Sequence, residues 1–336
     1  MEKREDGINL IRVIGLLFVF GFHFYLYNGY YHQKQIGAAM LFANASRGLF
    51  LSCNGLYMML TGYLKSGKTI NRHYYKCLLS VVISYVLAAS VSIPIRHFFL
   101  GDPQPFSIWK ERFVSFSGVY YGWYIRMYIG LILISPLINI AIKNITDKKL
   151  LLWIMVSCIA ATSLAPATPY TIFPAYWEIA YPLSYYVIGA VIKKLQPDVK
   201  KGICVAVILI MAFGTGSVTL LSTDGKLKDA VKWEFGAIWI MMIGVSIFLL
   251  LYKIKLSERF SCLVRFAARG SFFAYMLSNL MDAWIYELVP AWKNPKYYGL
   301  AFMCLTIPSY ILMIIVGNGM QKLVDWTLRN ISRKRL

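Results

Sequence analysis

Hydrophobic stretches of about twenty residues recur along the whole chain, separated by short polar or basic segments. A helix of about 20 apolar residues crosses the ~30 Å hydrocarbon core of a bilayer. The pattern predicts an all-α integral membrane protein, with about ten transmembrane helices bundled in a single membrane domain over residues 1–336. No polar stretch is long enough to build the core of a soluble extension. The predicted spans lie near 8–28, 48–64, 77–99, 119–142, 150–166, 176–193, 203–221, 234–252, 271–289 and 298–318.

The basic residues give the predicted bundle an orientation, because they concentrate in every second connection. With the amino terminus inside, the cytoplasmic segments are 1–7, 65–76, 143–149, 193–201, 253–269 and the tail from Lys322. They hold 23 of the 35 lysine and arginine residues. Cytoplasmic loops of membrane proteins carry such an excess. The sequence therefore predicts a multi-pass protein of a cell membrane (a bacterial inner membrane or a plasma membrane) with both termini in the cytoplasm.

Composition excludes several other classes of protein. Hydrophobic residues make up 58% of the chain and charged residues 15%. The net charge of +20 would suit a nucleic-acid partner, but its place in alternate short loops indicates the anionic lipid of the bilayer instead. The six cysteines are scattered singly, so we expect no disulfide framework and no metal site. The apolar segment 8–27 is too long for a cleaved signal peptide and has no small-residue cleavage site.

Arg12 and His23 are two ionisable residues inside the first predicted span. A step of eleven residues returns to nearly the same helix face, about 16 Å further along the axis. Such residues within a membrane suggest a functional site. Imidazole could act as a general base near neutral pH, or His23 could be a structural histidine bonded between helices. Arg12 could bind phosphate or carboxylate, or it could snorkel to the cytoplasmic interface.

The first cytoplasmic loop, residues 65–76, is basic and carries tyrosines. Its Gly67-Lys68-Thr69 fragment is similar to part of a P-loop, but the first glycine of that motif falls in a membrane helix and no strand precedes it. A P-loop is therefore rejected. The loop could still hold the phosphates of a nucleotide such as coenzyme A, or it could face lipid headgroups.

Aromatic residues are frequent in the predicted outer loops, where they suit either an interfacial aromatic belt or a platform for sugar rings. Trp123 and Arg126 open the fourth span, and Asp282 lies in the outer half of the ninth. A charge pair between Arg126 and Asp282 would act as a structural clamp and lower the cost of burying either residue. Glu178 either hydrogen-bonds a sugar or is a solvated carboxylate at a helix start.

Five short motifs resemble, in order, those of the acyltransferase 3 family of membrane acyltransferases. The first is Asn9 and Arg12 followed by His23, where the family carries Asp-x-x-Arg and then a histidine after ten intervening residues. Segment 54–64 is similar to the family's Phe-Phe-x-x-Ser-Gly-Phe-Leu, and segment 181–189 to its Tyr-x-x-x-Phe-x-x-Gly. The others are Trp123-Tyr124 followed by Ser135-Pro136-Leu137, and Ser271 to Tyr275. Each motif alone has low specificity, but the ordered set spans nearly the whole chain.

The resemblance implies a bundle of roughly ten helices that moves an acyl group, often acetyl, to a hydroxyl of a carbohydrate. Acetyl-CoA is the implied donor, used as a co-substrate, and surface polysaccharides or their lipid-linked precursors are the implied acceptors. His23 would be catalytic and Arg12 its essential partner. The family's basic Arg-x-x-Arg motif falls near His73 and Lys76, with Arg72 adjacent and Lys68 in the same loop.

The chain departs from the family pattern at several positions. The family's aspartate is Asn9, the serine before glycine is Thr61, and a histidine frequent after the late tyrosine is Ser278. The Arg-x-x-Arg motif is reduced to His73 and Lys76. We therefore keep three hypotheses: a membrane O-acyltransferase, a transporter or flippase for a lipid-linked sugar, and a catalytically silent scaffold of the same family.

Overall fold

The computed structural model describes residues 5–68, 74–164, 173–222 and 234–333. These residues form helices joined by turns, and no strand occurs among them. The helices are α1 (Asp6–Tyr27), α2 (Ala38–Leu51), α3 (Cys53–Lys65), α4 (Lys76–Phe99), α5 (Phe106–Val114), α6 (Trp123–Asn144), α7 (Lys148–Ser163), α8 (Ala175–Ile179), α9 (Tyr181–Leu195), α10 (Lys201–Ser222), α11 (Ile238–Leu251), α12 (Glu258–Ile285), α13 (Tyr298–Ala301) and α14 (Ile307–Arg333).

The all-helical prediction is confirmed for the described residues, but the boundaries of the spans differ from it. Five helical segments are long and apolar enough to cross a membrane: 6–27, 77–99, 123–144, 201–221 and 295–330. The predicted span 48–64 is divided at Ser52, where α2 ends and α3 begins. Helix α12 begins at Glu258, well before the predicted start at 271. The count of about ten spans and the orientation of the termini therefore stay predictions.

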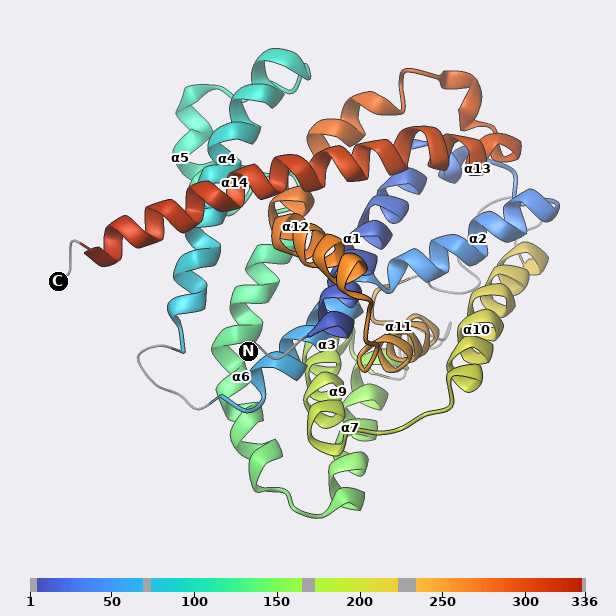
Figure 1. Cartoon of the computed structure of the whole chain (residues 1–336). Coiled ribbons are helices and arrows are strands. Elements are labelled where there is room, and N and C mark those ends of the chain that lie inside the picture. The colour runs from blue at the N-terminus through green and yellow to red at the C-terminus, as the bar shows by residue number, and fades with distance from the viewer. Residues whose placement is uncertain (1–4, 69–73, 165–172, 223–233, 334–336) are drawn as a thin grey trace.

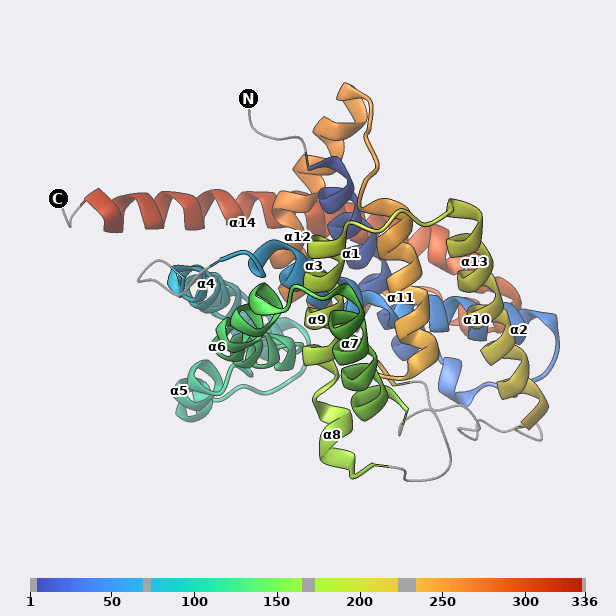
Figure 2. The ribbon, with the colours of Figure 1, turned by 90° about the horizontal axis from the view of Figure 1, so that it is seen from below.

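Helix α1 lies at the centre of the bundle and packs against α2, α3, α11 and α12 (Figure 1). Helices α4, α5 and α6 lie on one side of this centre, and α2, α10 and α13 lie on the other, as the view from below shows (Figure 2). Helix α14 crosses α12 and continues beyond the bundle toward the carboxyl terminus. Because α1 is central, many of its side chains are in contact with other helices.

Helices α3 and α9 cross at a close approach of their backbones. A Cβ atom added to Gly62 would lie 2.0 Å from the carbonyl oxygen of Tyr186, and one added to Gly189 would lie 2.0 Å from that of Met59. Lipid tails are as apolar as the side chains, so the hydrophobic effect does not drive membrane helices together and they associate mainly through close van der Waals packing. Small residues such as glycine allow that close packing of two backbones. This crossing fixes α3 in the centre of the bundle, where its side chains line the cavity described below.

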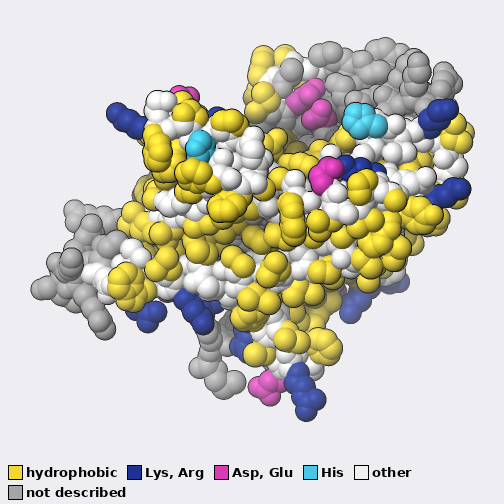
Figure 3. Space-filling model, turned by 90° about the horizontal axis from the view of Figure 1, so that it is seen from above, with side chains coloured by type: hydrophobic (Ala, Val, Ile, Leu, Met, Phe, Trp, Pro, Cys, Tyr) yellow, Lys and Arg dark blue, Asp and Glu magenta, His cyan; other side chains and the backbone are white. Residues whose placement is uncertain are grey.

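The outside of the bundle is largely apolar. Large hydrophobic side chains are exposed on many helices, including Leu137 on α6, Trp153 on α7 and Phe260 on α12. Figure 3 shows one such face, where hydrophobic side chains cover most of the surface between scattered charged ones. Patches of this size on a soluble monomer would be unusual. The surface agrees with the apolar helices in indicating a membrane protein.

Candidate active site

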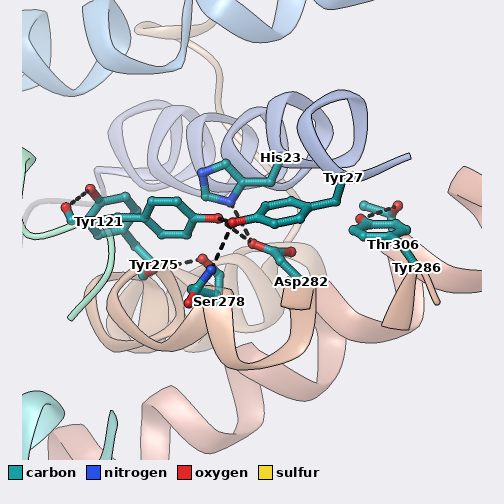
Figure 4. A network of polar contacts seen from close by, with 9 residues as sticks. His23, Tyr27, Tyr121, Tyr275, Ser278, Asp282, Tyr286 and Thr306 are labelled. Atoms are coloured by element: carbon teal, nitrogen blue, oxygen red, sulfur yellow. Dashed lines mark hydrogen bonds and ion pairs between the residues drawn. The ribbon is translucent and has the colours of Figure 1, made fainter. Parts of the chain in front are cut away.

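His23 of α1 and Asp282 of α12 form a buried pair where these two helices pack together. Nδ1 of His23 lies 2.9 Å from Oδ2 of Asp282, and the side chains are 6% and 1% exposed. The oxygen lies off the axis of the ring N–H, so the contact is an ion-pair approach rather than an aligned hydrogen bond. Figure 4 shows the second ring nitrogen turned away from the carboxylate.

Two tyrosines, Tyr27 and Tyr121, lie beside this pair (Figure 4), and Asn279 joins them through a hydrogen bond. The Tyr121 hydroxyl donates to Oδ2 of Asp282 at 3.0 Å and lies 3.3 Å from the Tyr27 hydroxyl. The Tyr121 ring also stacks on the imidazole of His23, with the ring centroids 3.9 Å apart and the planes 24° from parallel. The Asn279 amide donates to the Tyr27 hydroxyl at 3.0 Å, so Tyr27 links Asn279 to Tyr121. The imidazole is thereby held between a carboxylate and an aromatic ring.

The expected charge pair between Arg126 and Asp282 is wrong. Arg126 is exposed on α6, whereas Asp282 is buried and has its ion-pair contact with His23. The physical reason lies in the faces of the two helices: α12 presents Asp282 to α1 at the centre of the bundle, and α6 presents Arg126 to the outside. The clamp that the sequence suggested is replaced by a contact between two predicted site residues.

A cavity of about 360 Å³ opens between α1, α3, α4, α6 and α12. Its wall is mostly apolar, and Arg12 and Lys65 contribute cationic side chains to it. Tyr124 and Tyr275 also line the cavity, whereas His23 does not. The Tyr275 hydroxyl donates to the backbone carbonyl of Tyr121 at 2.7 Å, and the Tyr121 ring stacks on His23, so these two tyrosines link the cavity wall to the imidazole.

Arg12 enters this cavity without a carboxylate partner among the described residues. Its guanidinium donates to Oδ1 of Asn9 at 3.1 Å, and its backbone carbonyl accepts from the Tyr57 hydroxyl at 2.9 Å. Asn9 stands where the resembling family has an aspartate, and an amide orients the guanidinium without neutralising it. The positive charge therefore remains available to an anion in the cavity.

A family model described as an acyltransferase domain matches residues 5–317, which include Arg12, His23, Asp282 and the cavity lining. The chain belongs to the acyltransferase 3 family. The comparisons with curated proteins and with solved structures find no match. The suspected family is thus confirmed, and with it a membrane acyltransferase as the general class.

The start of the predicted coenzyme A loop of this acyltransferase, at Lys65, lies at the cavity. Lys65 ends α3 and places its ammonium 5.5 Å from the centroid of the Tyr74 ring, and Lys68 is exposed. The Asn139 amide of α6 donates to the carbonyls of Lys65 and Lys68, which ties the start of the loop to α6. The side chain of Lys76, which begins α4, lies outside the described residues.

Arg72 and His73 also lie outside the described residues. The sequence singled out these two with Lys68 and Lys76 for binding acyl-CoA, and it did not single out Lys65. The structure nevertheless brings both Lys65 and Arg12 to the lining of the cavity, because α1 and α3 pack together and both form its wall.

The remaining predicted residues lie outside the contacts around His23. Trp123 begins α6 and stacks on Phe235 with the ring centroids 5.8 Å apart. Glu178 is in the short helix α8 and is partly exposed. Both stay candidates for contacts to an acceptor and neither is part of the buried pair.

Three residues of the network were not predicted from the sequence: Tyr27, Tyr121 and Asn279. Tyr121 belongs to an aromatic run that also suits an interfacial belt, and Tyr27 ends the first span in a similar setting. Asn279 follows Ser278, the position where the family frequently has a histidine. Ser278 donates to the carbonyl of Tyr275 within its own helix at 2.9 Å, whereas Asn279 reaches Tyr27. The side chain that joins the network is thus one position beyond the family's histidine.

Proposed function

We propose that this acyltransferase moves an acyl group, acetyl in the simplest case, from acyl-CoA to a hydroxyl of a carbohydrate. The observation that supports this most is the buried contact of His23 with Asp282, 2.9 Å apart, which leaves the second ring nitrogen free to act as a base. That nitrogen takes the hydroxyl proton while the oxygen attacks the thioester carbonyl. The carbon–sulfur bond then breaks, and the thiolate of CoA takes the proton back.

The cavity supports an acyl-CoA donor. Phosphates suit the cationic side chains of Arg12 and Lys65, and the apolar wall suits the uncharged arm and the acyl group. With the predicted orientation, in which both termini are cytoplasmic, Arg12 and Lys65 would lie toward the cytoplasmic side of the cavity. His23 does not line the cavity, so side chains must move for the thioester to reach it; Tyr275 and Tyr121, which link the cavity wall to the imidazole, are the candidates.

A carbohydrate acceptor is supported by the exposed aromatic side chains at the opposite ends of the helices. Tyr120, Trp123, Tyr176 and Trp177 are all exposed, and their flat apolar faces suit the faces of sugar rings. A polysaccharide or its lipid-linked precursor would reach these side chains from the outer side of the membrane.

The test is transfer of label from radioactive acetyl-CoA into the carbohydrate fraction of membranes that contain the protein. General-base assistance is typically worth about 10²–10⁴-fold, so we expect His23→Gln to lower the rate by that order. Arg265→Ala, which removes an exposed cation on α12, is the matched control. Equal incorporation by wild type and His23→Gln would exclude His23 as the base, and no incorporation by the wild type would exclude acetyl transfer to carbohydrate.

A further inference from the structure

Asp282 is a buried carboxylate whose neighbours direct it toward an imidazole. Its side chain is 1% exposed, and burying a charge is costly unless good partners surround it. Its ion-pair partner among the described residues is His23, and no lysine or arginine contacts it there. Asp282 therefore does not join two helices through a salt bridge to a lysine or arginine among the described residues.

The carboxylate itself is oriented by Tyr121. The hydroxyl of Tyr121 donates to Oδ2, the same oxygen that approaches Nδ1 of His23, while Oδ1 has no hydrogen-bond partner among the described residues. One phenol thus touches both members of the pair, since its ring stacks on the imidazole and its hydroxyl binds the carboxylate. The hydrogen bond from Tyr121 therefore holds Oδ2 of Asp282, rather than Oδ1, next to the imidazole of His23.

The imidazole is oriented by the same contacts. Its face is covered by Tyr121 and its Nδ1 edge meets Asp282, so the second ring nitrogen is the one directed elsewhere. In this structure Nδ1 approaches Oδ2 at 2.9 Å without an aligned hydrogen bond. Catalytic hydrogen bonds are often poorly aligned without substrate and tighten when a substrate binds.

We infer that Asp282 is the positioning residue of His23, an inference that rests on the proposed function. The carboxylate accepts the Nδ1–H bond and keeps the lone pair on the other ring nitrogen, which faces the acceptor hydroxyl. It also stabilises the imidazolium that forms when the proton is taken up. A carboxylate that holds a histidine in the productive tautomer has this effect in other enzymes.

The first experiment compares Asp282→Asn and Asp282→Glu in the acetyl-transfer assay. The amide of Asn can donate to Nδ1 and so select the opposite tautomer, and kcat should fall about 10²–10⁴-fold, as expected for loss of the base. KM for acetyl-CoA should stay unchanged because Asp282 does not line the cavity. Asp282→Glu should restore part of kcat. Asp325→Asn, which removes a carboxylate from a surface ion pair with Arg269, is the matched control.

A double variant separates positioning from a general effect on folding. A residue that acts through His23 has nothing to contribute once His23 is gone. In the His23→Gln background, Asp282→Asn should therefore cause no further loss of rate. An additional loss in that background, together with a lower melting temperature, would assign Asp282 a structural role and overturn the inference.

A chemical readout makes the inference independent of the transfer assay. Diethylpyrocarbonate modifies an imidazole nitrogen that carries a free lone pair, and mass spectrometry of the peptide containing His23 measures the rate. We expect modification to be several-fold slower in Asp282→Asn than in wild type or Asp325→Asn. Equal rates, or full transfer activity of Asp282→Asn while His23→Gln is inactive, would overturn the inference and leave the proposed function intact. Full activity of His23→Gln would overturn the proposed function itself.

Discussion

Replacing Gly62 by alanine should separate two helices at the centre of the bundle. The new Cβ would lie 2.0 Å from the carbonyl oxygen of Tyr186, where ordinary contacts begin at about 3.4 Å. The obstacle is backbone, so no side-chain rotation relieves it. Helices α3 and α9 must therefore move apart by about 1.0–1.4 Å at this point, which brings the contact to 3.0–3.4 Å. Gly189→Ala meets the same obstacle at the carbonyl oxygen of Met59.

The cost of this separation follows from the contacts that it loosens. A gap of 0.5–1 Å forfeits about a quarter to a half of each van der Waals attraction across it. Tyr185, Tyr186, Met58 and Met59 are fully or almost fully buried near this crossing, so the loss affects large side chains. Overpacking of this kind typically costs about 1–3 kcal/mol, and we expect Gly62→Ala near the upper end. At roughly 2 °C per kcal/mol the melting temperature in detergent should fall by about 5 °C.

The double variant gives the sharper result. Gly62→Ala and Gly189→Ala both require the same separation of α3 from α9, so the second substitution should add much less than the first. Gly130→Ala on α6 and Gly214→Ala on α10 are the controls, because a Cβ there has no atom within 4 Å. These should melt at the wild-type temperature or slightly above it. A wild-type melting temperature for Gly62→Ala, or additive losses in the double variant, would refute the packing argument.

Two further predictions concern the site. Arg12→Ala should raise KM for acetyl-CoA by about 10–100-fold, because one charge-assisted hydrogen bond is worth about 1.5–3 kcal/mol, and Arg265→Ala should leave KM unchanged. Unaltered acetyl-CoA saturation in Arg12→Ala would contradict the donor cavity. Tyr121→Phe keeps the ring stacked on His23 but removes the hydrogen bond to Asp282, so kcat should fall about tenfold in the membrane transfer assay. An unchanged kcat would show that the hydroxyl does not orient the carboxylate.

The spacing of Arg12 and His23 shows which features of the site helical periodicity can predict. Their spacing predicts one shared face on the first helix, and the structure places Arg12 in the cavity and His23 in a buried pair. The periodicity does not predict which side chains of other helices lie near Arg12 and His23. Tyr121 and Tyr275 come from other segments of the chain, and they link the cavity wall to the imidazole.

The sequence by itself determined the membrane class, the helical content and the family, because these depend on local hydropathy and on short motifs read in order. It also selected His23 and Asp282 separately as polar residues within apolar segments. Their pairing was decided by the tertiary structure. Residues on one helix have a fixed geometry, whereas the partner of a side chain on another helix depends on which faces the bundle brings together. Packing of α1 against α12 turned Asp282 toward His23 and left Arg126 outside.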